Sequence, residues 1–83
     1  MYDILYTEQA LNQLKKLEKE IQQRVISVLE RCRIRPYNHV KKIVGSKYFR
    51  LRIGDYRVIL DIMNNKLLIL VVEAGHRRNT YKK

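Results

Sequence analysis

Three arginines stand where strand alternation and a tight turn would bring them to one face of a sheet. Residues 48–60 read YFRLRIGDYRVIL, so Arg50 and Arg52 alternate with apolar side chains. If Gly54-Asp55 is a two-residue type II′ turn, Arg52 pairs with Arg57 across the hairpin. Two opposed arginines destabilise an isolated sheet, and an anion between them removes that repulsion. The pattern therefore indicates a site for a polyanion, most simply a phosphate backbone, with Arg57 pointing into solvent.

The basic charge is concentrated in the second half of the chain. The 83 residues include 18 Lys or Arg and 8 Asp or Glu, which gives a net charge of +10. Residues 1–40 carry seven basic and five acidic side chains, whereas residues 41–83 carry eleven and three. This asymmetry favours a binding face for an acidic partner over the alternative, a generally solvated basic surface.

Cysteine and histidine usage argues against disulfide and metal chemistry. Cys32 is the single cysteine, so we expect a reducing compartment, the cytoplasm. It falls on the apolar stripe of an expected helix, which predicts a buried thiol rather than a nucleophile. His39 and His76 have no cysteine partners, so neither a metal nor a cofactor is expected. The longest apolar run, residues 67–72, is too short to cross a bilayer, and no signal peptide is recognised.

A single domain over residues 1–83 is expected, with the element order βααβββ. Residues 2–6 predict a short strand, and Thr7 is a suitable N-cap for a helix after it. Two apolar stripes at helical spacing follow: Ala10, Leu11, Leu14 and Leu17, then Ile21, Val25, Val28, Leu29 and Cys32. The stripes do not align smoothly across residues 18–20, which favours a helical hairpin over one continuous helix. Pro36 is expected to end the second helical region.

The second half of the chain predicts a basic loop and three strands. The loop covers residues 35–46 and closes at Gly45, and the strands cover residues 47–53, 56–63 and 66–73. The last strand is apolar on both faces, which predicts a central position in the sheet. The expected fold class is α+β, with the helical hairpin packed on one face of a small antiparallel sheet.

A second tight turn sets the expected position of the C-terminal segment. Asn64-Asn65 is predicted to be a two-residue turn because Asn tolerates a positive φ. The resulting register pairs Leu60 with Ile69, Arg57 with Val72, and Tyr56 with Glu73. Residues 74–77 would then emerge beside the first turn and bring Arg77 close to Arg52.

These segments resemble the RelE/ParE toxin superfamily, and its RelE-type branch in particular. The resemblance spans nearly the whole chain and is most specific at Tyr56-Arg57 and at Gly75-His76-Arg77-Arg78. It implies a RelE-like, microbial-ribonuclease-like domain. For RelE-type members it also implies an endoribonuclease that cleaves mRNA on the ribosome and so inhibits translation. The implied partners are the ribosome, mRNA and a RelB-like antitoxin, in a toxin–antitoxin heterotetramer.

The resemblance also implies catalytic roles for five residues: Arg50, Arg52, Arg57, Arg77 and Tyr81. Arg50 and Arg52 stand where RelE proteins have lysines. Because arginine keeps its proton up to a pKa above ~12, it is a poor general base. Tyr81 matches a tyrosine that stacks on a substrate base and is implicated in proton transfer. The alternatives are an ion pair with Asp61 for Arg50 and simple packing for Tyr81.

Proton transfer and RNA contact have further candidates. Histidine titrates near neutral pH, so His76 is a candidate acid or base, with a structural histidine as the alternative. Contacts to RNA are expected from Lys41, Lys42, Lys47, Arg78 and Lys82. For the loop lysines the alternative is ordinary solvation.

The expected chemistry is metal-free cleavage by the ribose 2′-OH, which attacks its own 3′-phosphate. The planar fork of arginine suits the stabilisation of phosphate charge. The chief alternative is a ParE-type toxin, a non-enzymatic inhibitor of DNA gyrase on the same fold. A third reading is an RNA- or ribosome-binding module without catalysis. The arginine cluster favours the nuclease, because a gyrase binder does not need cations around one phosphate.

Overall fold

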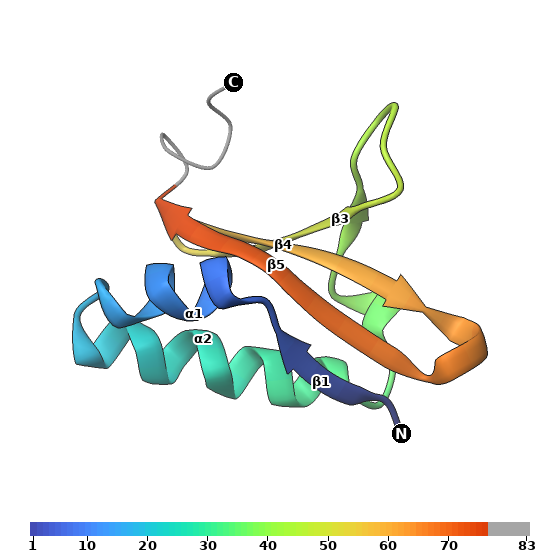
Figure 1. Cartoon of the computed structure of the whole chain (residues 1–83), viewed down its shortest axis with the longest axis horizontal. Helices are drawn as coiled ribbons and strands as arrows, with labels where there is room; N and C mark the ends of the chain where they lie inside the picture. The colour runs from blue at the N-terminus through green and yellow to red at the C-terminus, as the bar shows by residue number, and fades with distance from the viewer. Residues whose placement is uncertain (77–83) are drawn as a thin grey trace.

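The computed structural model describes residues 1–76, in which two helices cover one face of a five-stranded sheet (Figure 1). The elements are β1 (Asp3–Tyr6), α1 (Glu8–Lys15), α2 (Lys19–Cys32), the 3₁₀ turn η1 (Pro36–Asn38), β2 (Lys41–Lys42), β3 (Phe49–Ile53), β4 (Tyr56–Met63), the 3₁₀ turn η2 (Asn64–Lys66) and β5 (Leu68–His76). The strand order is β1-β5-β4-β3-β2, with β1 parallel to β5 and the other pairs antiparallel. The predicted α+β class and the central position of the last strand are confirmed.

The predicted helical hairpin is confirmed, and its ends follow from local chemistry. Thr7 is the N-cap of α1, and its Oγ1 accepts a hydrogen bond from the backbone N–H of Ala10 at 3.0 Å. The chain leaves the helix after Lys15 and re-enters it at Lys19. Helix α2 ends at Cys32, before Pro36, which opens η1 instead of continuing the helix.

The hydrophobic core lies between the helices and the sheet face that they cover. Its buried members from the helices are Ala10, Leu14, Val25, Leu29 and Cys32, and from the sheet Leu51, Ile53, Val58, Leu60, Ile62, Ile69, Val71 and Ala74. Burial raises the pKa of the Cys32 thiol to about 11. The part of the prediction that places this thiol in the interior is therefore confirmed.

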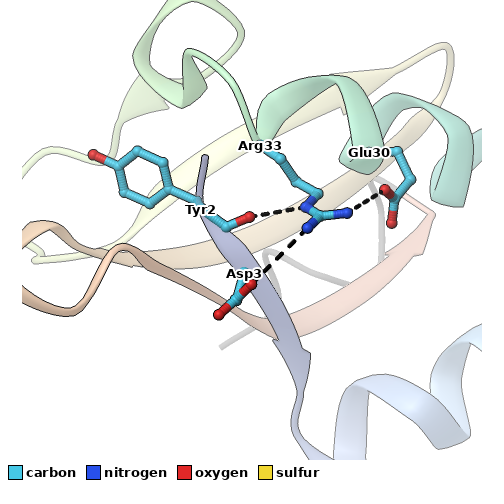
Figure 2. Close-up of polar contacts among 4 residues, drawn as sticks. All are labelled: Tyr2, Asp3, Glu30 and Arg33. Atoms are coloured by element: carbon cyan, nitrogen blue, oxygen red, sulfur yellow. Dashed lines mark hydrogen bonds and ion pairs between the residues drawn. The ribbon is translucent and has the colours of Figure 1, made fainter.

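Strand β1 is fastened to the end of α2 by one arginine (Figure 2). Arg33 donates from Nε to the carbonyl oxygen of Tyr2 at 2.8 Å and from Nη1 to Glu30 Oε1 at 2.9 Å. Its Nη2 also lies 3.9 Å from Asp3 Oδ1. The backbone N–H of Tyr2 donates to the Arg33 carbonyl at 2.8 Å. This network joins the C-terminal end of α2 to the outer strand β1.

The residues predicted as a basic loop, 35–46, contain more structure than expected. They include η1 and the short strand β2, which pairs with β3 at the edge of the sheet. The following turn places Gly45 at φ +75°, a conformation that glycine adopts without a Cβ penalty. The strand expected over residues 47–53 begins at Phe49.

The connection between β4 and β5 is longer than the predicted Asn64-Asn65 turn. It consists of η2 followed by Leu67 in the left-handed conformation, with φ 49°. The side chain of Asn64 stabilises this arrangement, because its Oδ1 accepts the hydroxyl hydrogens of Tyr2 at 2.7 Å and Tyr37 at 2.9 Å. The prediction of a two-residue turn is therefore wrong.

The longer loop and a β-bulge shift the register between β4 and β5. The observed pairs are Leu60 with Val71, Arg57 with Gly75, and Tyr56 with His76, so the predicted partners Ile69, Val72 and Glu73 are wrong. Ile59 pairs with Glu73, which leaves Val72 as an extra residue on β5. The bulge reverses the alternation of β5. It places Ala74 in the core and turns the Glu73 side chain to the face away from the helices.

Side chains of α1 and its N-cap replace a neighbouring strand at the end of β5. Strand β1 pairs with β5 only as far as Val71. Beyond it, Thr7 Oγ1 donates to the carbonyl of Val72 at 3.1 Å, and Gln13 Oε1 accepts the backbone N–H of Ala74 at 2.8 Å. These bonds satisfy some of the backbone N–H and C=O groups along the free edge of β5, and they hold its C-terminal end in place.

Candidate functional site

The predicted arginine hairpin is present in the register expected from the sequence. Ile53 pairs with Tyr56, and Arg52 lies directly opposite Arg57. Gly54 has φ +59°, and Asp55 is not among the described residues with a positive φ, as a type II′ turn requires. Directly opposed residues share a face, so Arg52 and Arg57 lie on one side of the sheet. Helices α1 and α2 cover the other side (Figure 1).

Arg57 is buried, with 7 % of its surface exposed, so its predicted projection into solvent is wrong. It lies on β4, which has a neighbouring strand on each side. Ile59 and Asp61 follow it on the same face and are also buried. Arg52 lies on β3 beyond the residues that pair with β2, and it is exposed. The pair therefore consists of one fixed guanidinium and one that solvent or a ligand can reach.

A cationic pocket of about 150 Å³ lies beside this pair. It is lined by His39, Lys41, Arg50 and Arg52. Lys41 on β2 is the cross-strand partner of Arg50, and Arg50 and Arg52 are two residues apart on β3, so their side chains share a face. Three permanent cations around a space of this size suit a phosphate group, which arginine binds through two parallel hydrogen bonds.

The other predicted loop lysines lie elsewhere. Lys42 pairs with Phe49, and its Nζ is 5.9 Å from the Phe49 ring centroid, on the face opposite Lys41. Lys47 Nζ forms an ion pair with Asp61 at 3.7 Å and lies 5.5 Å from the Tyr48 ring centroid. The structure thus brings only Lys41, of the three loop lysines, into the pocket with the arginines.

His76 lies on the helix side of the sheet. Its ring contacts Tyr56 edge-on at 5.5 Å between centroids. Together with Gln13, Lys16 and Leu17 it lines a separate pocket of about 400 Å³ at the end of α1. The structure does not bring this predicted proton-transfer candidate together with the arginines. Four further predicted site residues, Arg77, Arg78, Tyr81 and Lys82, lie outside the described residues.

Two residues near the arginines were not singled out from the sequence as site residues. Arg24 of α2 approaches the hairpin turn, with Nη1 3.7 Å from where a Cβ on Gly54 would lie. Its proximity depends on helix–sheet packing, for which the sequence carries no local signal. His39, in contrast, stands two residues before Lys41, and the alternation of an extended chain could have placed both on one side.

Metal and membrane functions receive no support within residues 1–76. No group of three or more His, Cys, Asp or Glu side chains in this part of the chain could hold a metal ion. No helix there is both long and apolar enough to cross a membrane.

Comparison with known proteins identifies the family. The model of a family described as the ParE toxin of type II toxin–antitoxin systems matches residues 4–81. The chain belongs to the RelE/ParE toxin family. A relative from Escherichia coli, described as a putative RelE-like toxin protein, is 30 % identical to this toxin over 82 residues. That match covers 95 % of this toxin and 86 % of the relative.

Solved structures share the fold of this toxin. The intact E. coli RelBE toxin–antitoxin complex contains a chain that matches with a TM-score of 0.81 at 18 % identity, covering 92 % of this toxin and 96 % of that chain. The RelBE2 toxin–antitoxin complex of Mycobacterium tuberculosis contains one that matches with a TM-score of 0.83 at 22 % identity, covering 94 % and 93 %. The fold expected from the resemblance, two helices on a RelE-like sheet, is confirmed.

Proposed function

We propose that this toxin is a metal-independent mRNA endoribonuclease that acts on the ribosome and thereby inhibits translation in the cytoplasm. The supporting observation is the pocket in which Lys41, Arg50 and Arg52 converge beside the buried Arg57. Like charges are gathered there at a cost in stability, and a phosphate bound among them would offset the repulsion.

The proposed reaction uses the substrate's own 2′-OH as nucleophile. The arginines stabilise the negative charge that builds on the phosphate in the transition state. Arg57, Arg52 and Arg50 are the described residues proposed for this role. Arg77 is proposed for the same role, Arg78 and Lys82 are proposed to contact RNA, and Tyr81 is proposed to stack on a base. Because DNA lacks the 2′-OH, the reaction is specific for RNA.

The proposed partner that keeps the activity in check is a RelB-like antitoxin in a heterotetramer with this chain. The structurally similar chains from E. coli and M. tuberculosis are parts of toxin–antitoxin complexes. An acidic antitoxin segment that reaches the open sheet face would meet a protein with a net charge of +10.

Inhibition of DNA gyrase without catalysis is the second candidate function. It is favoured by the description of the matching family model, which is that of ParE toxins. The same cationic face could then contact an acidic surface of the gyrase, with no need for a positioned phosphate.

One experiment separates the two functions. The toxin is expressed inducibly, the 5′ ends of cellular mRNA are mapped, and gyrase supercoiling is assayed with the purified protein. New 5′ ends within translated codons, absent with an Arg52→Ala variant, support the nuclease. Loss of supercoiling with intact mRNA would replace it by gyrase inhibition. Intact mRNA with normal supercoiling and ribosome-bound toxin would indicate a non-catalytic binding module.

A further inference from the structure

We propose that His39 is the general base of the cleavage reaction, an inference that rests on the proposed nuclease function. The observation that carries it is the composition of the pocket, which is lined by one histidine and three cations, Lys41, Arg50 and Arg52. Removing the 2′-OH proton needs an acceptor at the place where the phosphate binds. Among these four groups, only a neutral imidazole offers a lone pair near neutral pH.

The backbone explains why the histidine is in position. His39 caps η1, and its N–H donates to the carbonyl of Pro36 at 3.1 Å. Proline fixes the backbone where the turn begins. Lys41 of β2 follows His39 by two residues, and Lys41 pairs with Arg50. Strand pairing therefore carries the histidine to the pocket although it lies outside the strand. Its side chain is exposed, so a substrate can reach the ring.

Among residues 1–76, the charged groups that face His39 come from two strands, Lys41 from β2 and Arg50 with Arg52 from β3, and none of the lining residues is a carboxylate. A neighbouring carboxylate would stabilise the protonated imidazole, which cannot accept the 2′-OH proton. The competing histidine, His76, lies on the other side of the sheet with Tyr56 and the end of α1.

The proposed step balances as follows. A nitrogen of His39 takes the 2′-OH proton while O2′ forms a bond to phosphorus. The bond from phosphorus to O5′ of the next nucleotide breaks, and O5′ takes up a proton from water. The products are a 2′,3′-cyclic phosphate and a 5′-hydroxyl end, and the imidazolium then returns its proton to solvent. Lys41, Arg50 and Arg52 stabilise the charge on the non-bridging oxygens.

The test measures single-turnover cleavage of a defined mRNA on purified ribosomes between about pH 5 and about pH 9. We expect the wild-type rate to rise with pH, as it does when a base must lose its own proton before it can act. His39→Gln should lower the neutral-pH rate by about 10²-fold or more and remove that rise. Imidazole added to a His39→Ala variant should restore part of the rate, because the pocket is open to solvent and a merely structural histidine would not be replaced in this way.

The outcomes separate this role from the function on which it rests. If wild-type protein does not cleave, the nuclease function and the role of His39 are both overturned. If wild-type protein cleaves and folded His39→Gln keeps its rate and pH profile, only the role of His39 is overturned. The same holds if His76→Gln, and not His39→Gln, abolishes the pH dependence. Circular dichroism of each variant checks the fold, which an exposed substitution at position 39 should leave intact.

Discussion

Arg57 combines burial with a charge that faces another arginine. It is 7 % exposed and lies opposite Arg52, with Gly75 on its other side. A fixed, pre-oriented cation stabilises a transition state without reorganisation, whereas the exposed Arg52 can adjust to the substrate.

Replacing Arg57 should therefore affect rate and stability together. Arg57→Ala should slow single-turnover cleavage by about 10²- to 10³-fold, as loss of a transition-state donor does. Arg57→Lys should keep partial activity, because lysine retains the charge and loses the bidentate fork. Thermal unfolding measured in parallel separates the two effects. Arg31→Ala, at an exposed position on α2, is the matched control and should behave as wild type. Wild-type cleavage by folded Arg57→Ala would remove this residue from the mechanism.

Cys32 should make the stability of the fold depend on pH in the alkaline range. Burial raises the pKa of its thiol from 9.0 to about 11. Between these values the unfolded chain releases the thiol proton and the folded chain keeps it, so this group makes stability fall as pH rises from about 9 to 11. Below the unfolded pKa its contribution does not change. Urea unfolding of wild type and Cys32→Ala across this range should show a smaller alkaline decline in the variant. Equal declines in both proteins would contradict the assignment.

At the scale of elements, the two β-hairpins differ in how well sequence predicts them. The β3–β4 hairpin is determined locally, by Gly54 in the turn and by regular alternation on either side. The β4–β5 connection depends on Asn64, which accepts hydrogen bonds from Tyr2 and Tyr37, residues distant in the sequence. It also holds Leu67 at a positive φ, which non-glycine residues seldom adopt. No local sequence pattern predicts the hydrogen bonds of Asn64 or the positive φ of Leu67.

The candidate site was also predictable only in part, where local periodicity determines it. The shared face of Arg50, Arg52 and Arg57 follows from strand periodicity, and the structure has it. The burial of Arg57 does not, although both neighbouring strands were predicted, because burial depends on how the surrounding side chains pack against it. The position of His76 on the helix side depends on the bulge at Val72, which shifts the alternation of β5. Bulges leave little trace in a strand that is apolar on both faces.

The network around Arg33 should contribute measurable stability. Arg33→Ala removes the hydrogen bonds to the Tyr2 carbonyl and to Glu30, and we expect a loss of about 1–2 kcal/mol in the free energy of unfolding. Equilibrium urea denaturation measures it. Lys19→Ala, an exposed helix residue, is the control and should change stability by less than about 0.5 kcal/mol. Cleavage by folded Arg33→Ala should be normal, and a selective loss of cleavage would assign Arg33 a different role.

At the scale of the whole molecule, charge sets how partners approach. Residues 41–83 carry eleven basic and three acidic side chains, so they account for +8 of the net charge of +10. A surface of this kind attracts anionic partners over about a Debye length, roughly 8 Å at physiological salt. Both proposed partners, RNA and an acidic antitoxin, would gain in association rate.

The association rate with an antitoxin should therefore fall as salt is added. In stopped-flow mixing we expect a decrease of at least about tenfold between roughly 50 mM and 500 mM salt, while the dissociation rate changes less. A variant with both Arg50 and Arg52 changed to Gln should start slower and show a shallower salt dependence. Lys66→Gln, in η2 and away from the cationic pocket, should retain the steeper one. An association rate independent of ionic strength would rule out electrostatic steering.

The strand that completes the sheet is, among the strands of residues 1–76, the last to be synthesised. Strand β5 lies between β1 and β4, and its pairing with β1 joins residues 3–6 to residues 68–71. The chain consequently cannot assemble stepwise from its N-terminus as it leaves the ribosome. The apolar faces of β1 and both helices stay uncovered until residues 68–76 have left the ribosome. The reason is that the long-range contacts between β1 and β5 cannot form before β5 is available. Nascent chains shorter than this should be unfolded, and the native fold should form in one late, cooperative step.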